Sequence, residues 1–203
     1  MIAIIDYGVG NLFSLKSSFA RIGAQTVVTD DPTVIARADR IILPGVGAFG
    51  DAIEKLRRTR LDKVVISEAE SGKKLMGICL GMQLLFEKSY EYGEHDGLGL
   101  LAGSVVPMRG RIDEGLMIPH IGWNSLRMKD EGHPLFRYIK NGDFVYFVHS
   151  YYAEGCSDSL IASTEYSRDI TASVASGNVA GMQFHPEKSG DVGLNILKAF
   201  CEW

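Results

Sequence analysis

The first half of the chain alternates short apolar runs with segments of helical period, and this alternation limits the fold more than any other feature. Four runs have the length and composition of buried strands: residues 2–5, 26–29, 40–43 and 75–78. Between them, apolar side chains recur at helical spacing in three segments: 11–22, 52–56 and 61–69. Because strands that alternate with helices form parallel sheets with helices on both faces, we expect an α/β fold.

The helix boundaries are marked by polar residues and glycines. Asn11 is expected to open the first helix and Gly23 to close it, while Gly72 stops the helix before the fourth strand. A further helix is expected after residue 78, carrying Met82, Leu85 and Phe86.

The second half of the chain has a different pattern. Six segments are strand-like: 104–108, 125–128, 144–149, 160–166, 170–175 and 179–184. Helical period returns only at 192–200, so an antiparallel extension of the sheet is expected. Because no linker, repeat or low-complexity stretch interrupts the 203 residues, we expect one domain spanning 1–203.

Charge and cysteine usage exclude several classes of protein. A formal net charge of −4 argues against nucleic-acid binding, and no apolar run approaches the length of a membrane span. The N-terminus has no basic flank or cleavage site of a signal peptide. Cys79, Cys156 and Cys201 are odd in number and widely spaced, which predicts neither disulfides nor a zinc site and favours the cytoplasm. We assign Cys156 and Cys201 to packing.

Cys79 stands where a strand turns directly into a helix. Gly77 and Gly81 flank it two residues away on each side, which is the thiol version of the G-x-S-x-G nucleophile elbow. A helix N-terminus favours the thiolate, and the amide of Leu80 is free to face a developing oxyanion. A small buried cysteine at the end of a core strand is the alternative, and the elbow alone does not decide between them.

A candidate base follows the last predicted strand. His185 and Glu187 flank Pro186, and side chains two apart on an extended backbone point the same way. Glu187 can then fix the tautomer of His185 and leave its other ring nitrogen to accept the cysteine proton. The alternatives are a surface histidine in a polar loop and a zinc site at Cys79, His185 and Glu187, which lacks a fourth ligand.

A glycine-rich loop, Gly45 to Gly50, follows the third strand. It fits G-x-G-x-x-G, but it does not follow the first strand, and a helix occupies the place of the acid-ending strand that dinucleotide sites require. The other use of such a loop is to aim backbone N–H groups at an oxyanion. Beside a cysteine elbow and a His-x-Glu sequence, the oxyanion use is favoured.

Together, the segments 44–47, 77–83 and 185–187 resemble the class I glutamine amidotransferases, and their order and spacing match over the whole chain. The resemblance implies a flavodoxin-like open sheet and a Cys-His-Glu triad, and we expect no cofactor and no metal. It also implies roles in binding glutamine and its oxyanion for the PGVG loop and two further segments, namely for Gly45, Val46, Gly47, Leu80, Gln83, His149, Ser150 and Tyr151.

Four longer segments, 5–12, 119–124, 146–151 and 185–189, are similar to one subfamily, the glutaminase subunits of imidazole glycerol phosphate synthase. This similarity implies a (β/α)₈-barrel cyclase subunit as partner, which receives ammonia through a channel. Docking residues implied in this way are Asn11, Trp123, Tyr146 and Lys188. Core packing of the two aromatics and a solvated lysine are the alternative. Three alternative functions also stay open. The chain could be a glutaminase subunit that serves anthranilate, GMP or pyridoxal phosphate synthesis, a cysteine peptidase or deglycase of similar architecture, or a nucleotide-binding module.

Overall fold

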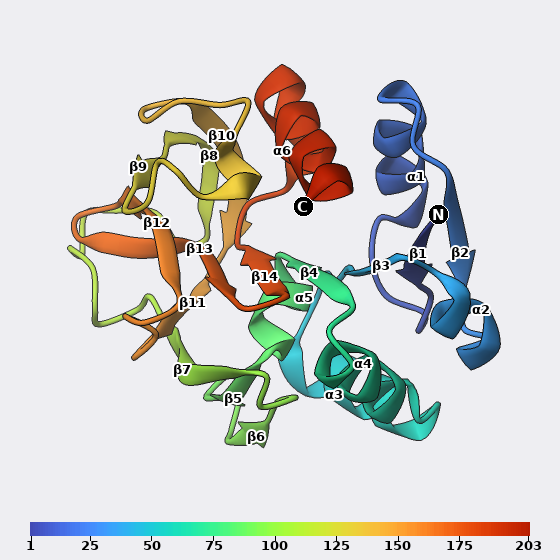
Figure 1. Cartoon of the computed structure of the whole chain (residues 1–203). Helices are drawn as coiled ribbons and strands as arrows, with labels where there is room; N and C mark the ends of the chain where they lie inside the picture. The colour runs from blue at the N-terminus through green and yellow to red at the C-terminus, as the bar shows by residue number, and fades with distance from the viewer.

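The computed structural model describes all 203 residues, and its centre is an eight-stranded sheet (Figure 1). Five strands are parallel to one another, in the order β2 (Thr26–Thr29), β1 (Ile2–Ile5), β3 (Arg40–Leu43), β4 (Lys74–Ile78) and β14 (Val179–Met182). The order 2-1-3-4 followed by one more strand is the flavodoxin-like order. The α/β, mostly parallel fold is therefore confirmed.

The antiparallel extension is also confirmed. β13 (Asp169–Ser176) pairs with β14 in the opposite direction, and β12 (Leu160–Glu165) and β9 (Arg127–Met128) continue the sheet. The change from parallel to antiparallel pairing occurs at β14, the strand that leads into His185.

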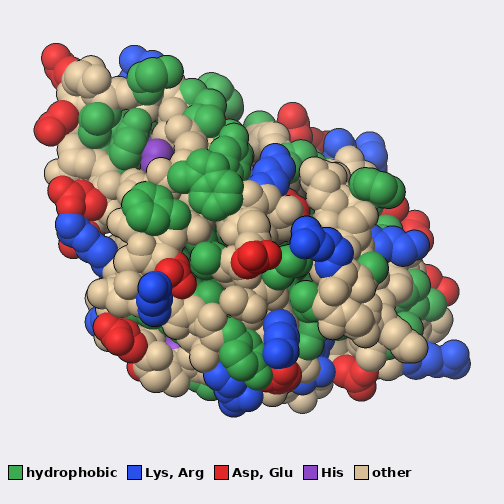
Figure 2. All heavy atoms as spheres, turned by 90° about the horizontal axis from the view of Figure 1, so that it is seen from above, with side chains coloured by type: hydrophobic (Ala, Val, Ile, Leu, Met, Phe, Trp, Pro, Cys, Tyr) green, Lys and Arg blue, Asp and Glu red, His purple; other side chains and the backbone are tan.

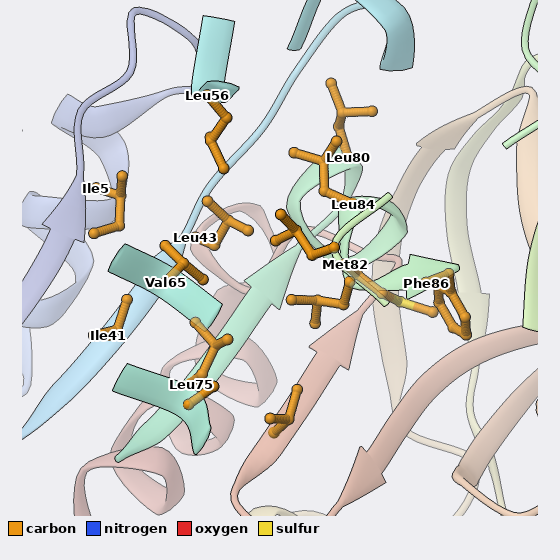
Figure 3. Packing of buried hydrophobic residues seen from close by; sticks show 14 of the residues in the cluster. Ile5, Ile41, Leu43, Leu56, Val65, Leu75, Leu80, Met82, Leu84 and Phe86 are labelled. Atoms are coloured by element: carbon orange, nitrogen blue, oxygen red, sulfur yellow. The ribbon is translucent and has the colours of Figure 1, made fainter. Parts of the chain in front are cut away.

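Helices cover both faces of the sheet (Figure 1). On one face, α1 (Leu12–Arg21) and the C-terminal α6 (Gly190–Glu202) share a core cluster that includes Leu15 and Phe200. The other face is covered by α2 (Pro32–Arg37), α3 (Phe49–Arg58), α4 (Leu61–Glu70) and α5 (Leu80–Leu84). Figure 3 shows this second cluster, with Val65 of α4 lying against Leu43 and Leu75 of the sheet.

Side-chain caps fix where the first two helices begin. The carboxamide of Asn11 accepts the Ser14 N–H, so α1 begins where the sequence predicts. The carboxylate of Asp31 accepts the Thr33 N–H, and Pro32 takes the first helical position of α2. The sequence analysis missed α2, since a six-residue helix with one buried residue gives almost no periodic signal.

Two smaller sheets complete the structure. β8 (His120–Ser125) and β10 (Phe144–His149) form an antiparallel ribbon, while β11 (Tyr151–Glu154), β7 (Leu101–Pro107), β5 (Phe86–Ser89) and β6 (His95–Asp96) form a four-stranded sheet. Short 3₁₀ helices lie at Pro134–Phe136 (η1) and Pro186–Lys188 (η2). None of the helices has the length and apolar character needed to cross a bilayer.

Two predicted elements are wrong. Phe86 begins β5 instead of lying in a helix, because the carbonyls of Leu84 and Phe86 accept N–H groups from Leu98 and Gly99, which the local sequence does not reveal. The strand expected at 125–128 is divided, since Ser125 ends β8 and Arg127 begins β9 in the main sheet.

Candidate active site

Cys79 lies at a strained turn between β4 and α5. Its backbone angles are φ 55° and ψ −112°, outside the regions that residues with a Cβ normally occupy. Strain of this kind concentrates at functional sites and persists only where the surroundings enforce it. Here the Cys79 N–H donates to the carbonyl of Met182 on β14 at 2.7 Å, which ties the turn to the neighbouring strand.

The flanking glycines are required by the close approach of backbones. A Cβ at Gly81 would stand 1.9 Å from the carbonyl oxygen of Leu43, and one at Gly77 would stand 2.6 Å from the oxygen of Gly81. The elbow therefore packs directly against the end of β3, where the glycine-rich loop begins.

His185 and Glu187 form a buried pair just after β14. The Nδ1 of His185 lies 2.8 Å from the Oε1 of Glu187, and their side chains are 3% and 2% exposed. The sequence analysis expected an extended backbone here, but the segment turns as η2 with Pro186 at its first position. The turn still brings the carboxylate to the ring, and the Nε2 of His185 is buried with no hydrogen-bond partner.

The charge state of His185 follows from competing effects. Burial alone would lower its pKa, but the charges of Cys79 and Glu187 and the hydrogen bond between Nδ1 and Glu187 outweigh burial and raise the pKa of His185 to about 9. The site therefore favours a protonated imidazole beside the cysteine sulfur near neutral pH.

Cys79 and His185 line a common cavity of about 320 Å³. Seven residues that the resemblance assigned to substrate or oxyanion binding lie on its wall: Val46, Gly47, Leu80, Gln83, His149, Ser150 and Tyr151. Gly45 is the exception and does not line the cavity. A Cβ there would stand 2.7 Å from the Gly81 amide nitrogen, so Gly45 lets the loop and the elbow touch.

The buried side chain of Gln83 is held by two acceptors. Its Nε2 donates to the carbonyl of Tyr151 and to the Oε1 of Gln183, both at 3.0 Å. With both amide hydrogens engaged, the Gln83 carbonyl oxygen is the group left to accept a hydrogen bond from a ligand.

Four residues of the site were missed by the sequence analysis. Glu91, Pro119 and Val148 line the cavity, and the buried amide of Gln183 reaches the sulfur of Cys79 at 3.9 Å. Burial raises the pKa of Glu91, whose carboxylate accepts the Phe49 N–H at 2.7 Å. A polar residue inside the apolar run 179–184 was the available signal for Gln183, whereas nothing local distinguished Glu91.

The residues assigned to docking lie in different settings. Trp123 is 55% exposed, which argues against a core role, and its ring meets that of Tyr146 edge-on at 6.1 Å. Lys188 lies with its ammonium 5.9 Å from the Tyr146 ring and also lines the cavity. Asn11, described above, caps α1.

In Figure 2, hydrophobic side chains gather on the left of the face, the side on which β8 and β10 lie in Figure 1.

The β8–β10 ribbon is joined to the segment that carries His185. The carbonyl of Tyr146 accepts the His185 N–H, and the Tyr146 N–H donates to the Oγ of Ser189, both at 2.9 Å. The same Ser189 hydroxyl donates to the His185 carbonyl at 2.6 Å. The exposed face of the ribbon and the His185 segment thus belong to a single hydrogen-bonded unit.

Metal ligation has no support in the side-chain arrangement. No three His, Cys, Asp or Glu side chains are grouped so that they could hold a metal ion. The Cys79, His185 and Glu187 arrangement is one in which the carboxylate binds the imidazole instead.

Comparison with known proteins assigns the family. The model for "Glutamine amidotransferase class-I" matches residues 3–202. Imidazole glycerol phosphate synthase subunit HisH of Sulfurimonas denitrificans is 50% identical, with 100% of this chain and 98% of that protein aligned. The HisH subunit of Bacillus velezensis is 51% identical, with 100% and 96% aligned.

Solved structures agree at the level of the fold. A glutamine amidotransferase crystal structure aligns with a TM-score of 0.76 at 19% identity, covering 99% of this chain and 100% of that one. The structure of PurLQS from Thermotoga maritima aligns with a TM-score of 0.74 at 21% identity, covering 99% and 97%. With a family model matching nearly the whole chain and relatives about half identical to it, this chain belongs to the class-I glutamine amidotransferase family, close to its HisH subunits.

Proposed function

We propose that this chain is the glutaminase subunit of imidazole glycerol phosphate synthase, a single amidotransferase domain that hydrolyses L-glutamine to glutamate and ammonia. The observation that carries the proposal is the strained Cys79 sharing a cavity with His185, whose ring is bound by the buried Glu187. The identity to HisH subunits supports the choice among amidotransferases over subunits serving anthranilate, GMP or pyridoxal phosphate synthesis.

The chemistry follows from the charge state of the pair. The thiolate of Cys79 attacks the side-chain carboxamide carbon, and the resulting oxyanion is held by backbone N–H groups of Leu80 and of Val46 or Gly47. Leu80 is the first residue of α5, so its N–H has no partner within the helix. Protonated His185 gives its proton to the amide nitrogen, and ammonia leaves.

A γ-glutamyl thioester remains on Cys79. Neutral His185 then takes a proton from water, and the hydroxide formed attacks the thioester carbon. Collapse of this second tetrahedral species releases glutamate and restores the thiolate beside protonated His185. Glu187 holds the ring in the orientation that both steps need, by the 2.8 Å bond to Nδ1.

Polar groups on the cavity wall suit the amino-acid end of glutamine. The free carbonyl oxygen of Gln83 and the carboxylate of Glu91 are acceptors that match a substrate ammonium. Residues 149–151, at the junction of β10 and β11, also line the cavity, and their backbone groups suit the substrate carboxylate.

Replacing Cys79 with Ala is the direct test. Cys79→Ala should abolish glutamate release, while Cys156→Ala, at a buried thiol outside the cavity, should retain it. A glutamine-analogue diazoketone should label Cys79 in competition with glutamine but not with peptides, which separates the proposal from a cysteine peptidase. Substantial hydrolysis by the Cys79→Ala variant would end the assignment.

The ammonia is used by a partner. We infer a (β/α)₈-barrel cyclase subunit that docks on the exposed face of the β8–β10 ribbon, where Ile121, Trp123 and Phe144 present apolar surface. Tyr146 lies on the same face, and Lys188 lies near its ring and also lines the cavity; Asn11 is included in the interface because of the resemblance. We expect the complex in the cytoplasm, where the three free thiols stay reduced.

Docking is tested by activity. The isolated chain should hydrolyse glutamine slowly, and the cyclase with its nucleotide ligand should accelerate hydrolysis. Replacing Trp123 on the ribbon with Ala should weaken this acceleration. The matched control is Tyr138→Ala, at an exposed aromatic that is not part of the ribbon and whose hydroxyl donates to Glu202 on α6. Equal turnover with and without the cyclase would remove the partner proposal and leave the glutaminase assignment standing.

A further inference from the structure

Two buried histidines face each other across the β8–β10 ribbon. His120 on β8 is directly opposite His149 on β10, and the Nδ1 of His120 lies 3.1 Å from the Nε2 of His149. Both residues are almost fully buried, and only His149 lines the active-site cavity. His120 is therefore one step removed from the substrate.

The hydrogen-bond partners determine which ring nitrogens carry hydrogen. The Nδ1 of His149 lies 2.9 Å from the carbonyl of Tyr151, which can only accept, so Nδ1 is protonated and Nε2 of the neutral ring accepts. His120 must then donate from Nδ1. Its own Nε2 accepts from the Nδ2 of Asn124 at 3.4 Å, and the same amide donates to the carbonyl of Glu165 at 2.8 Å.

Packing keeps His120 in this role. Its ring is stacked between Phe147, with centroids 4.9 Å apart, and Tyr166, at 4.0 Å. Burial lowers the pKa of His120 to about 4 and that of His149 to about 3, so both rings stay neutral at pH 7. These hydrogen bonds need neutral rings, because each histidine donates from Nδ1 and accepts at Nε2, and a protonated ring carries hydrogen on both nitrogens.

The chain ends on groups of the catalytic site. The Tyr151 carbonyl that accepts from His149 also accepts from Gln83, and Gln83 donates in turn to Gln183, whose amide reaches the sulfur of Cys79. His149, Ser150 and Tyr151 form one wall of the cavity. The orientation of the His149 ring thus decides whether the Tyr151 carbonyl has one donor or two.

We propose that His120 is a positioning residue for glutamine hydrolysis, which fixes the Nδ1–H tautomer of His149 and through it the 149–151 wall that receives glutamine. The inference rests on the proposed function of the cavity. It assigns His120 no contact with substrate and no proton transfer.

Two substitutions of His120 separate donation from shape. His120→Phe keeps a ring between Phe147 and Tyr166 but removes the donor to His149. His120→Asn places an amide N–H near the position of Nδ1 and restores the donor. In the complex with the cyclase, His120→Phe should raise KM for glutamine about tenfold with a smaller change in kcat, and His120→Asn should recover most of the loss.

The tautomers give a readout that needs no variant and no catalysis. In the ¹⁵N spectrum of the whole chain at neutral pH, two of the five histidines should be neutral with hydrogen on Nδ1, the less common form in water. The His120→Phe spectrum should lack the His120 signals and shift those of His149. A matched control is His133→Phe, which removes a half-buried histidine that accepts the Leu135 N–H outside the site.

The outcomes are distinct. A wild-type spectrum without two neutral Nδ1–H rings would overturn the tautomer assignment directly, even if a variant failed to fold. Wild-type KM in a folded His120→Phe variant, or equal KM changes in the Phe and Asn variants, would overturn the positioning role. Loss of hydrolysis in the wild type itself would instead count against the proposed function, and the spectrum would still report on the tautomers.

Discussion

Glu187→Gln removes one charge from the buried pair while keeping the shape of the side chain, and its effect can be worked from the geometry. The pKa of His185, raised from an ordinary 6.5 to about 9 against the opposing effect of burial, corresponds to about 3 kcal/mol of preference for the protonated ring. Cys79 and Glu187 supply this preference together. If Glu187 supplies half of it, the pKa of His185 falls by about one unit in the variant, and kcat/KM should fall up to about tenfold at pH values above the lowered pKa.

The sign of the pH effect is also defined. With the carboxylate gone, burial has less opposition, so the pKa of His185 falls and the protonated ring is lost at lower pH. The alkaline limb of kcat/KM for glutamate release should therefore move to lower pH, measured with the cyclase present from neutral pH to above 9. Glu68→Gln, on α4, breaks a partly buried ion pair with Lys73; it is the matched control and should leave the profile unchanged. Wild-type kcat/KM with an unmoved alkaline limb in Glu187→Gln would refute the reasoning.

Other consequences follow from the fold and the ribbon. Gly81→Ala should cost about 2–3 kcal/mol of unfolding free energy in urea titrations, because its Cβ would stand 1.9 Å from the Leu43 oxygen; wild-type stability would contradict the packing described. Because His120 and His149 have folded pKa values near 4 and 3 and unfolded values near 6.5, the unfolded chain binds more protons in between. Stability should thus fall as pH drops from 6.5, by up to about 1.4 kcal/mol per pH unit for each ring, and a flat urea midpoint between pH 6.5 and 5 would refute this. Trp123→Ala should leave the unfolding free energy of the isolated chain within about 0.5 kcal/mol, since the side chain is more than half exposed. The same variant should weaken cyclase binding in a calorimetric titration at least about tenfold, and undiminished affinity would remove Trp123 from the docking face.

The parallel half of the fold was predictable because its signals are local. β1, β2 and β3 have the bounds that the apolar runs predict, since each run is short, rich in β-branched residues and followed directly by an aspartate or a proline: Asp6, Asp30 and Pro44. The elbow was also predictable, because the need for glycine at 77 and 81 is written in the sequence around Cys79. Nonlocal pairing is the reason for the failure at Phe86, whose strand exists only because Leu101 lies beside it.

The residues of the candidate site also fall into those that local sequence predicts and those that it does not. His185 and Glu187 are two residues apart, so a short-range argument brings them together, although the backbone between them is a 3₁₀ turn and not extended. Gln183 reaches the Cys79 sulfur, and Glu91 reaches the cavity, only after strands and loops distant in sequence are assembled, and neither has a local motif. The resemblance to amidotransferases supplied Gln83 and residues 149–151, which spacing alone would not have selected.

β10 is bound to the His185 segment through hydrogen bonds from Tyr146 and Ser189, and its inward side chains Val145 and Phe147 are buried in the core, so the ribbon supports the cavity with one side and leaves the other side exposed. Substitutions can change the outward side chains of the ribbon while the inward side chains continue to support the cavity. Grafting the ribbon of one amidotransferase onto another should accordingly change which partner receives the ammonia without changing the hydrolysis, provided that Ser189 and the inward histidines His120 and His149 are transferred with the ribbon.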